Sequence, residues 1–175
     1  MKFLFASDNH GDAAILKEIA NRFAPQVDVM FHCGDSTMQP NDPAMAPFTG
    51  IKGNNDWQLD YPQELLVKRG GEQIFLTHGD RYNVYTGLGQ LENEAKRRRA
   101  TIVAFGHTHQ ILCQMHSQTL FLNPGSTSLP RGQYANLGGT FAIVTSEDHL
   151  FEVQYYDRQM QPVSDLHFRF QREEI

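Results

Sequence analysis

The stretch that decides the fold is residues 2–10, which read Lys2-Phe3-Leu4-Phe5-Ala6-Ser7-Asp8-Asn9-His10. Residues 2–7 predict a buried strand, and the polar residues after them predict its end. Residues 11–23 carry apolar side chains at helical spacing, and Asp12 suits the N-cap position. Residues 27–33 predict a second strand. A strand, a helix and a strand make a βαβ unit, so we expect these two strands to be parallel.

Beyond this unit the chain changes from alternating strands and helices to mostly strands. Residues 36–47 contain three prolines and predict a loop with at most one helical turn. The next elements expected are a strand at 49–52, a hairpin of strands at 64–69 and 72–77, and a helix at 88–100. Apolar runs predict further strands at 101–105, 111–115, 119–122, 139–144, 150–156 and 163–170.

The second half therefore differs in character from the first. The short connections between its strands, such as residues 116–118 and 146–149, favour antiparallel pairing. The sequence thus predicts an α/β fold of mixed, partly α+β character. No repeat, low-complexity tract or linker divides it, so we expect a single domain over residues 1–175.

The amino-acid composition indicates a globular protein and argues against several other classes. Hydrophobic residues make up 40% of the 175 residues and charged residues 20%, which is a globular profile. The formal charge of −5 gives no electrostatic reason to follow a nucleic-acid backbone, so long nucleic acid is not an expected partner. The sequence shows no signal peptide and no membrane-length apolar run. Because Cys33 and Cys113 are the two cysteines, we expect no disulfide scaffold and a cytoplasmic location.

Five polar clusters lie at or near the ends of predicted strands. They are Asp8-Asn9-His10, Gly34-Asp35, Gly53-Asn54-Asn55-Asp56, His78-Gly79-Asp80 and Gly106-His107-Thr108-His109. In open α/β folds, the loops at the carboxyl ends of strands converge on the ligand site. The candidate metal donors in these clusters are Asp8, His10, Asp35, Asn54, His78, His107 and His109.

The donor types point to particular metals. Imidazole nitrogen with carboxylate or amide oxygen suits manganese, iron or zinc, and no thiolate belongs to the clusters. Seven donors exceed the needs of one tetrahedral ion, but they suffice for two ions that share a bridging carboxylate. Two metals about 3.5–4 Å apart serve phosphoryl chemistry, in which a hydroxide held between them attacks phosphorus.

Each cluster also has a structural explanation. Asp8 could cap the following helix, His78 could sit in an ordinary turn, and Asn54-Asn55 could be turn residues that tolerate left-handed backbone. His107 and His109 are harder to explain in this way, because alternation aims both rings in the same direction. The hypothesis of a built metal site rests on all five clusters together.

The ordered series Asp-x-His, Gly-Asp, Gly-Asn, His-Gly-Asp and Gly-His-x-His resembles that of the calcineurin-like metallophosphoesterases, over residues 1–131. The compact length, with Asn123-Pro124-Gly125-Ser126 after the last motif, most resembles the small YfcE-like phosphodiesterase branch. The resemblance implies a four-layer αββα sandwich of two mixed sheets flanked by helices, with a dinuclear metal site at the sheet edge.

The resemblance also implies how the donors divide between two divalent ions. The first ion would be held by Asp8, His10 and His109, the second by Asn54, His78 and His107, with Asp35 as the bridge. Manganese is the ion expected by analogy, with iron, nickel or zinc as alternatives. We predict Asn54, His78 and Asn9 as catalytic residues, where Asn9 either donates a hydrogen bond to phosphate or shapes the turn.

One position departs from the family pattern. Many family phosphatases carry a histidine after the ligand asparagine, where it assists the leaving group, and this chain has Asn55 there. An amide cannot act as a general acid, and losing positioned acid catalysis costs on the order of 10²–10⁴-fold. The departure favours diesters or activated esters over monoesters, and it leaves the leaving-group acid unassigned.

Other residues near the clusters could have either a functional role or a purely structural one. Asp56 and Asp80 could orient metal-bound imidazoles, Arg131 could meet a substrate phosphate, and Tyr82 and Tyr85 could stack on a base. The structural alternatives are an exposed or packed arginine and packed rings. The basic run 96–99 predicts a solvated helix face rather than an RNA-binding patch. We interpret His32, His116, His149 and His167 as ordinary.

The sequence therefore predicts a metal-dependent phosphodiesterase that hydrolyses a small phosphodiester by in-line attack. The site is expected to be open, with selectivity set by residues 36–47, 82–90 and 126–136. One alternative is a catalytically weak protein-interaction scaffold, as the retromer scaffold subunit resembles this branch in fold. Another is a nuclease acting on short oligonucleotides. The apolar C-terminal strands are compatible with a homo-oligomer.

Overall fold

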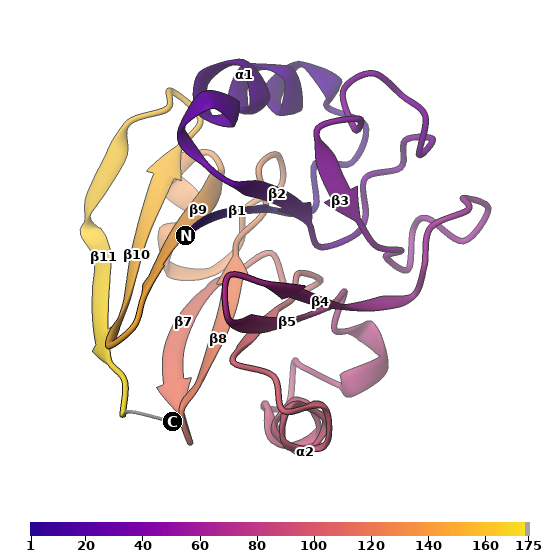
Figure 1. The fold of residues 1–175 in the computed structure, drawn as a ribbon. Coiled ribbons are helices and arrows are strands. Elements are labelled where there is room, and N and C mark those ends of the chain that lie inside the picture. The colour runs from indigo at the N-terminus through magenta and orange to yellow at the C-terminus, as the bar shows by residue number, and fades with distance from the viewer. Residues whose placement is uncertain (174–175) are drawn as a thin grey trace.

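A computed structural model describes residues 1–173, and within this range the strands form two sheets (Figure 1). The six-stranded sheet has the order β11 (Pro162–Gln171), β10 (Leu150–Asp157), β9 (Thr140–Glu147), β1 (Lys2–Ala6), β2 (Val29–His32) and β3 (Phe48–Gly50). The five-stranded sheet has the order β4 (Glu64–Arg69), β5 (Glu72–Thr77), β6 (Ile102–Ala104), β8 (Thr119–Pro124) and β7 (Ile111–His116).

Both sheets are mixed. In the first, β1, β2 and β3 are parallel, as predicted for the βαβ unit, and β9, β10 and β11 add antiparallel strands. In the second, β5, β6 and β8 are parallel, and β4 and β7 are antiparallel edge strands. The carboxyl ends of six parallel strands therefore point toward one edge of the two sheets.

The layers follow from alternation along the strands. Phe3 and Phe5 of β1 belong to the core between the two sheets, whereas Leu4 and Ala6 belong to the core under α1 (Ala13–Phe23). On the other side, α2 (Gly89–Arg98) packs Leu91 and Ala95 against the outer face of the five-stranded sheet. The order helix, sheet, sheet, helix is visible in Figure 1 and confirms the predicted αββα sandwich.

Element ends differ from the predictions where the backbone turns left-handed. The first helix begins at Ala13, because Gly11 has a φ of 83° and the side chain of Asp12 caps the backbone NH of Ile15. The helix predicted over 88–100 ends at Arg98, because Arg99 has a φ of 53°. Residues 36–47, all within the described part, form turns and no helix. Three short 3-10 helices complete the fold: η1 (Ala24–Gln26), η2 (Asp80–Tyr82) and η3 (Gly132–Leu137).

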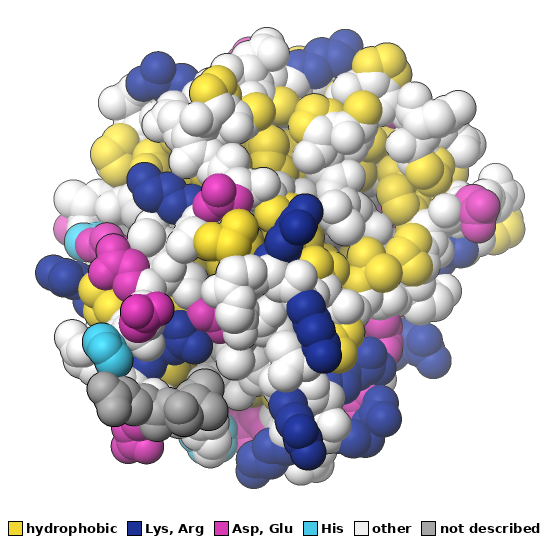
Figure 2. Space-filling view, viewed as in Figure 1, with side chains coloured by type: hydrophobic (Ala, Val, Ile, Leu, Met, Phe, Trp, Pro, Cys, Tyr) yellow, Lys and Arg dark blue, Asp and Glu magenta, His cyan; other side chains and the backbone are white. Residues whose placement is uncertain are grey.

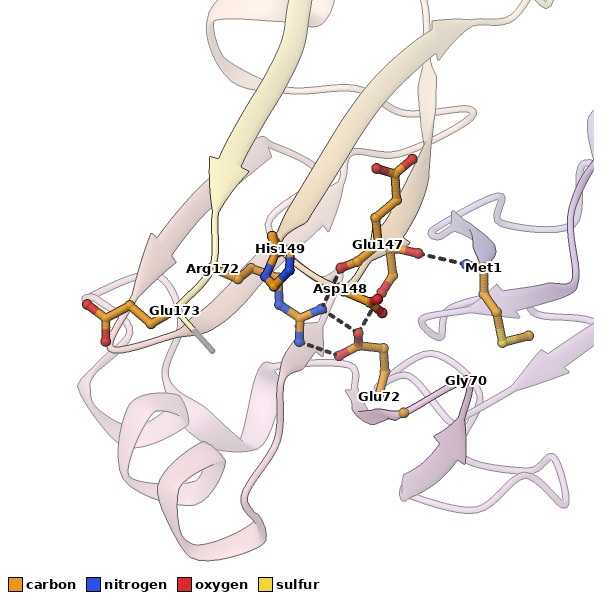
Figure 3. A pocket seen from close by; sticks show the side chains of 10 residues that line it. Met1, Gly70, Glu72, Glu147, Asp148, His149, Arg172 and Glu173 are labelled. Atoms are coloured by element: carbon orange, nitrogen blue, oxygen red, sulfur yellow. Dashed lines mark hydrogen bonds and ion pairs between the residues drawn. The ribbon is translucent and has the colours of Figure 1, made fainter. Parts of the chain in front are cut away.

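A pocket of about 450 Å³ lies at the opposite end of the strands and is shown in Figure 3. Its centre is an ion pair in which the Arg172 guanidinium lies 2.7 and 3.1 Å from the two carboxylate oxygens of Glu72. Ser146 donates to the same carboxylate at 2.5 Å, and the amino terminus of Met1 donates to the Ser146 carbonyl at 2.7 Å. The Arg172 guanidinium also lies 4.0 Å from the ring centroid of Phe151. These contacts join β5 of one sheet to β9 and β10 of the other, so we interpret this pocket as a structural clamp.

The clamp predicts a specific stability change. Arg172→Met leaves the Glu72 carboxylate, which is 3% exposed, without its cation. We expect the free energy of unfolding to fall by about 3 kcal/mol and the thermal midpoint to fall by roughly 6–12 °C. The double variant Arg172→Met/Glu72→Leu removes the stranded charge and should recover most of the loss. Denaturant melts of all three proteins measure this, and a double variant no better than the single one contradicts it.

Candidate metal centre

The seven predicted donors meet at the carboxyl ends of the parallel strands. Asp8 follows β1 and is fully buried, and its Oδ1 lies 3.2 Å from His109 Nε2, 3.9 Å from His78 Nε2 and 4.0 Å from His10 Nε2. Asp35 follows β2, and its Oδ2 lies 3.5 Å from His78 Nε2 and 4.0 Å from His10 Nε2. Two carboxylates thus face the same group of imidazoles.

The remaining donors lie on either side of this pair. The carbonyl oxygen of the Asn54 side chain lies 3.1 Å from His78 Nε2 and 2.9 Å from His107 Nδ1. On the other side, His10 Nε2 lies 3.2 Å from His109 Nε2. Asp8, His10 and His109 form one group compact enough to hold a metal ion, and Asp8, Asp35 and His78 form a second.

The chemistry of the donor set fits divalent cations. Asp8 Oδ1 is buried and has no hydrogen-bond partner within residues 1–173, although three imidazole nitrogens surround it. An uncompensated buried carboxylate oxygen is costly, and a cation compensates it. Neutral imidazoles place ring nitrogens toward each other at 3.2 Å, as between His10 and His109, when both point at a common ion.

The backbone that carries these donors is strained. Asp8, His10, Asp35, His107 and His109 all have φ between 45° and 67°, and they are five of the eleven non-glycine residues with positive φ in the described chain. Such conformations are uncommon outside glycine and concentrate at functional sites. Left-handed backbone turns the chain sharply at the strand end and points each side chain across the edge.

Two glycines allow the loops to approach closely. A Cβ at Gly106 would lie 2.1 Å from Ser7 Oγ and 2.5 Å from Asp8 Oδ2. A Cβ at Gly53 would lie 2.1 Å from Asp35 Oδ1. Both carboxylates are therefore packed against bare backbone, and this is the physical reason for glycine in two of the clusters.

Backbone carbonyls orient the key imidazoles. His78 Nδ1 lies 2.8 Å from the carbonyl oxygen of Cys33, and His109 Nδ1 lies 2.7 Å from that of Leu129. A proton on Nδ1 leaves Nε2 as the acceptor that faces the carboxylates. Asp56 and Asp80 were the residues predicted to orient imidazoles, but at His78 and His109 the acceptors are main-chain oxygens, which no sequence motif reveals.

Asp56 has a different role. Its buried carboxylate accepts hydrogen bonds from the backbone NH groups of Ser36 at 3.3 Å, Thr37 at 2.7 Å and Gly53 at 2.9 Å. It joins the loop after β2 to the loop after β3 and thereby places Asp35 beside Asn54. Asp80 is exposed at the start of η2.

For each remaining candidate near the site, the sequence allowed a functional role or a structural one, and the structure favours different roles for different residues. Asn9 is fully buried and its amide donates to the Asp12 carbonyl at 3.3 Å, which favours the turn-shaping alternative. Tyr82 donates to Glu64 at 2.6 Å and packs on Phe75, which favours packing. Tyr85 and Arg131, by contrast, both contact the Gly-His-x-His segment.

Asn55 lies against the central carboxylate. Its backbone NH donates to Asp35 Oδ1 at 2.8 Å, and its side-chain amide donates to Asp35 Oδ2 at 2.5 Å. The side chain that replaces the family histidine is therefore engaged with a predicted metal donor.

Asp35 and His78 shift each other's pKa values in opposite directions. Burial raises the pKa of the Asp35 carboxyl, but His78 and the amide donors of Asn55 outweigh it and leave the pKa below its usual value. Burial lowers the pKa of His78, but the Asp35 and Asp8 carboxylates outweigh it and raise the pKa to about 9. Burial and the neighbouring His78 lower the pKa of His107. The Asp35 carboxyl is thus ionised and the His78 ring is an imidazolium at neutral pH.

His32, interpreted from the sequence as ordinary, lies behind this site. It is fully buried with its ring 6.2 Å from the ring of Phe48, and neither ring nitrogen has a partner within the described residues. Burial lowers its pKa to about 4, so the ring is neutral at physiological pH. Its position within an apolar strand gave no signal that separates it from a packed aromatic residue.

Comparisons with known proteins agree with this site and fold. Residues 1–149 match the family model of the calcineurin-like phosphoesterase superfamily domain. The crystal structure of a conserved uncharacterized protein from Streptococcus pneumoniae, described as a predicted phosphoesterase, is similar with a TM-score of 0.92 and 32% identity, over 98% of this chain and 97% of that one. The chain belongs to the calcineurin-like phosphoesterase superfamily, and its class of enzyme is a metallophosphoesterase, a hydrolase.

Two relatives place the chain within the superfamily. It is 35% identical to the Probable metallophosphoesterase YsnB of Bacillus subtilis over 169 residues, which cover 97% of this chain and 98% of that protein. It is 26% identical to the Phosphodiesterase YfcE of Escherichia coli over 161 residues, which cover 75% of this chain and 82% of that protein. These relatives support the YfcE-like branch.

A more distant likeness concerns the fold alone. The structure of Vacuolar Protein Sorting 29 from Cryptosporidium parvum is similar with a TM-score of 0.75 at 18% identity, over 99% of this chain and 98% of that one. Within the described residues, no helix is both long and apolar enough to cross a membrane.

The raised pKa of His78 predicts proton release on metal binding. The pKa of His78 is about 9, so the ring is protonated at any pH below that value. Nε2 must lose its proton before it can bind a metal ion. At pH 7 we expect the release of about one proton from this group per protein, and an apparent metal affinity that rises up to about pH 9 and then levels off. Titration calorimetry with Mn²⁺ in buffers of different ionisation enthalpy measures the release. His167→Ala, at an exposed site, is the control, and binding without proton release at pH 7 contradicts the prediction.

Proposed function

We propose that this chain is a phosphodiesterase that uses two divalent metal ions to hydrolyse a small phosphodiester, as a single domain over residues 1–175. The observation that carries the proposal is the buried, unpartnered Asp8 Oδ1 with imidazoles on three sides. One ion would be held by Asp8, His10 and His109, the other by Asn54, His78 and His107, with Asp35 between them. When bound, such ions lower the pKa of water and neutralise phosphoryl oxygens.

The residues of the chain itself supply position and charge balance. Asp35 has contacts to His78 and His10, one from each proposed metal group, and this supports it as the shared ligand. Asn55 fixes the rotation of the Asp35 carboxylate through two hydrogen bonds. Cys33 contributes its carbonyl oxygen to His78, and burial raises the pKa of its thiol, so the donor set remains nitrogen and oxygen.

The donor set supports manganese as the ion, with iron, nickel or zinc as alternatives. Imidazole with carboxylate and amide oxygen is the mixture that these metals share, and no thiolate biases it toward the softer ones. The cytoplasm is the proposed location. Cys33 and Cys113 are both free in the structure, which suits a reducing compartment.

A diester is the proposed substrate because the side chain at position 55 has no acid function. The Asn55 amide is bonded to Asp35, so neither its chemistry nor its contacts provide a proton for a leaving alkoxide. A diester or an activated ester with a weakly basic leaving oxygen needs such a proton less than an alkyl monoester does.

The basic run 96–99 gives no support for processive action on long nucleic acid. Of the basic run 96–99, Arg97 pairs with Glu94 at 2.5 Å, and Arg98 pairs with both Glu94 and Glu64. In Figure 2 several basic side chains follow one another from the centre of the view toward its lower edge, and acidic side chains lie mainly to their left and among the basic ones at the lower right. Phosphate tracking needs unpaired, aligned cations. The scaffold alternative has no comparable observation in its favour, and it is the opposite outcome of the following test.

The proposal predicts metal-dependent turnover of a model diester. Purified protein stripped of metal should hydrolyse bis-p-nitrophenyl phosphate only after Mn²⁺ is added, and Asp35→Asn should lower the rate by about 100-fold or more, because a bridging ligand loses its charge. Asp165→Asn, an exposed carboxylate outside the site, is the matched control and should keep the wild-type rate. Equal inactivity of wild type and Asp35→Asn across manganese, iron, nickel and zinc favours the scaffold instead.

Position 55 predicts a shift between substrate types. Asn55→His places a titratable group at the leaving-group position, and we expect the ratio of p-nitrophenyl phosphate to bis-p-nitrophenyl phosphate turnover to rise by about tenfold or more. Asn55→Ala removes the same side-chain hydrogen bond to Asp35 without adding an acid, so its ratio should stay near that of wild type. A ratio that rises equally in both variants assigns the effect to the lost amide.

A further inference from the structure

A small pocket lies beside the candidate metal centre and is not used by the proposed metal ligands. Its volume is about 170 Å³, and its apolar walls are Val84, Phe105, Ile111 and Leu112. Thr108 and Gln110 complete the lining, and they flank His109 along the chain. The pocket therefore opens next to the Gly-His-x-His segment, which contributes two of the proposed ligands.

One wall of the pocket is an exposed but fixed aromatic ring. Tyr85 is 55% exposed, yet its ring packs edge-on against His107 with centroids 5.2 Å apart. Its hydroxyl donates to the His107 carbonyl at 3.3 Å and accepts from Arg131 at 3.3 Å. A ring held at both its edge and its hydroxyl has little conformational entropy to lose when a ligand packs on it.

Arg131 is a cation at the same rim. Its backbone NH donates to the His109 carbonyl at 3.0 Å, and the next residue, Gly132, is so close to Gln110 that a Cβ there would lie 2.9 Å from the side-chain oxygen. Within residues 1–173, no carboxylate lies at ion-pair distance from the Arg131 guanidinium. The guanidinium donates one hydrogen bond, to the Tyr85 hydroxyl. Its remaining NH groups are free to donate to an anion.

The pocket thus combines four apolar side chains with the polar groups of Tyr85, Thr108 and Gln110 and has a cation at its rim, which complements a phosphoester that carries a ring with both apolar and polar atoms. A cavity of about 150 Å³ lined by apolar side chains accepts one benzene molecule. A pocket of about 170 Å³ therefore matches the size of one six-membered ring.

Resting on the proposed phosphodiesterase function, we propose that this pocket binds a single planar ring on the ester substituent that stays on phosphorus, while Arg131 donates to a non-bridging phosphoryl oxygen. The substrate class is then an aryl or one-ring heteroaryl phosphodiester. We assign the substituent as the retained one because the family resemblance puts the leaving group beside Asn55, on the loop after β3, whereas the pocket lies beside β6 and β7 of the other sheet.

The first experiment keeps the leaving group constant. Manganese-loaded wild type is assayed on methyl, phenyl and 1-naphthyl p-nitrophenyl phosphate. We expect kcat/KM about tenfold higher for phenyl than for methyl, and naphthyl no better than phenyl. Tyr85→Ala and the pocket-filling variant Ile111→Trp should bring the phenyl-to-methyl ratio to about one. Tyr85→Phe keeps the ring and should keep most of the preference.

Trp57→Ala is the control, because Trp57 is an exposed ring on the loop that follows β3. It should retain the phenyl preference. A preference that disappears in Trp57→Ala but persists in Tyr85→Ala overturns the proposal, as does a naphthyl ester that is preferred over phenyl. Equal wild-type rates on methyl and phenyl esters overturn it while leaving the phosphodiesterase function standing.

A binding measurement separates the pocket from the chemistry. Titration calorimetry of phenylphosphonate and methylphosphonate into the Mn²⁺-loaded protein should show about tenfold tighter binding of the phenyl compound, lost in Tyr85→Ala and Ile111→Trp. Mn²⁺ affinity is measured alongside, and Ile111→Trp, which leaves the Tyr85 contacts with His107 in place, should match wild type. If no ester is turned over but this selectivity is present, the pocket stands and the proposed reaction fails. If the two phosphonates bind equally, the pocket assignment fails.

Discussion

The Asp8 carboxylate follows a strand of the six-stranded sheet and contacts residues that follow strands of the five-stranded sheet. One of its oxygens accepts from Ser7 Oγ at 2.5 Å and from the backbone NH of His107 at 3.3 Å, and the other faces three imidazoles. Ser126 Oγ also donates to the Asp8 carbonyl at 2.7 Å. A buried carboxylate is tolerated only when its surroundings compensate its charge. Part of that compensation comes from the loops after β5 and β6 of the opposite sheet, and Ser126 after β8 binds the Asp8 main chain, so the relative position of the two sheets is fixed at this edge.

The same edge is where the fold departs from relaxed geometry. Left-handed backbone at a non-glycine residue costs of the order of 1–3 kcal/mol, and the edge concentrates five such residues. The cost is sustained because the strands that lead into these turns have core side chains such as Phe3, Phe31 and Ile102 that are fully buried between the sheets. His32 also fits this arrangement. Its buried ring is neutral, so it fills space near Asp35 without placing a second positive charge beside His78. At the far end of the strands, the Glu72–Arg172 clamp holds the sheets together without strained backbone.

Much of this organisation could be predicted from the sequence. The hairpin strands at 64–69 and 72–77 have their predicted bounds, because alternation and the Gly70-Gly71 turn mark both ends. The polar clusters after the strands predicted where donors converge, since parallel strands end at one edge. What could not be predicted depends on contacts between distant residues. No local pattern shows that the Leu129 carbonyl orients His109, that Asp56 binds backbone NH groups of two loops, or that His32 is buried without a partner.

The division between rigid and variable parts explains why the chemistry was easier to predict than the substrate. The donors are polar side chains set within five residues of a strand end, so their position follows from the sheet. Tyr85 and Arg131 lie on loops whose course depends on how Gln110 packs against Gly132 and how the Tyr85 hydroxyl reaches the His107 carbonyl. Binding residues on loops over a rigid scaffold are the part of a fold that varies between relatives. A reaction can thus be common to a superfamily while the ester that enters the site, on our proposal, depends on a 170 Å³ pocket beside these loops.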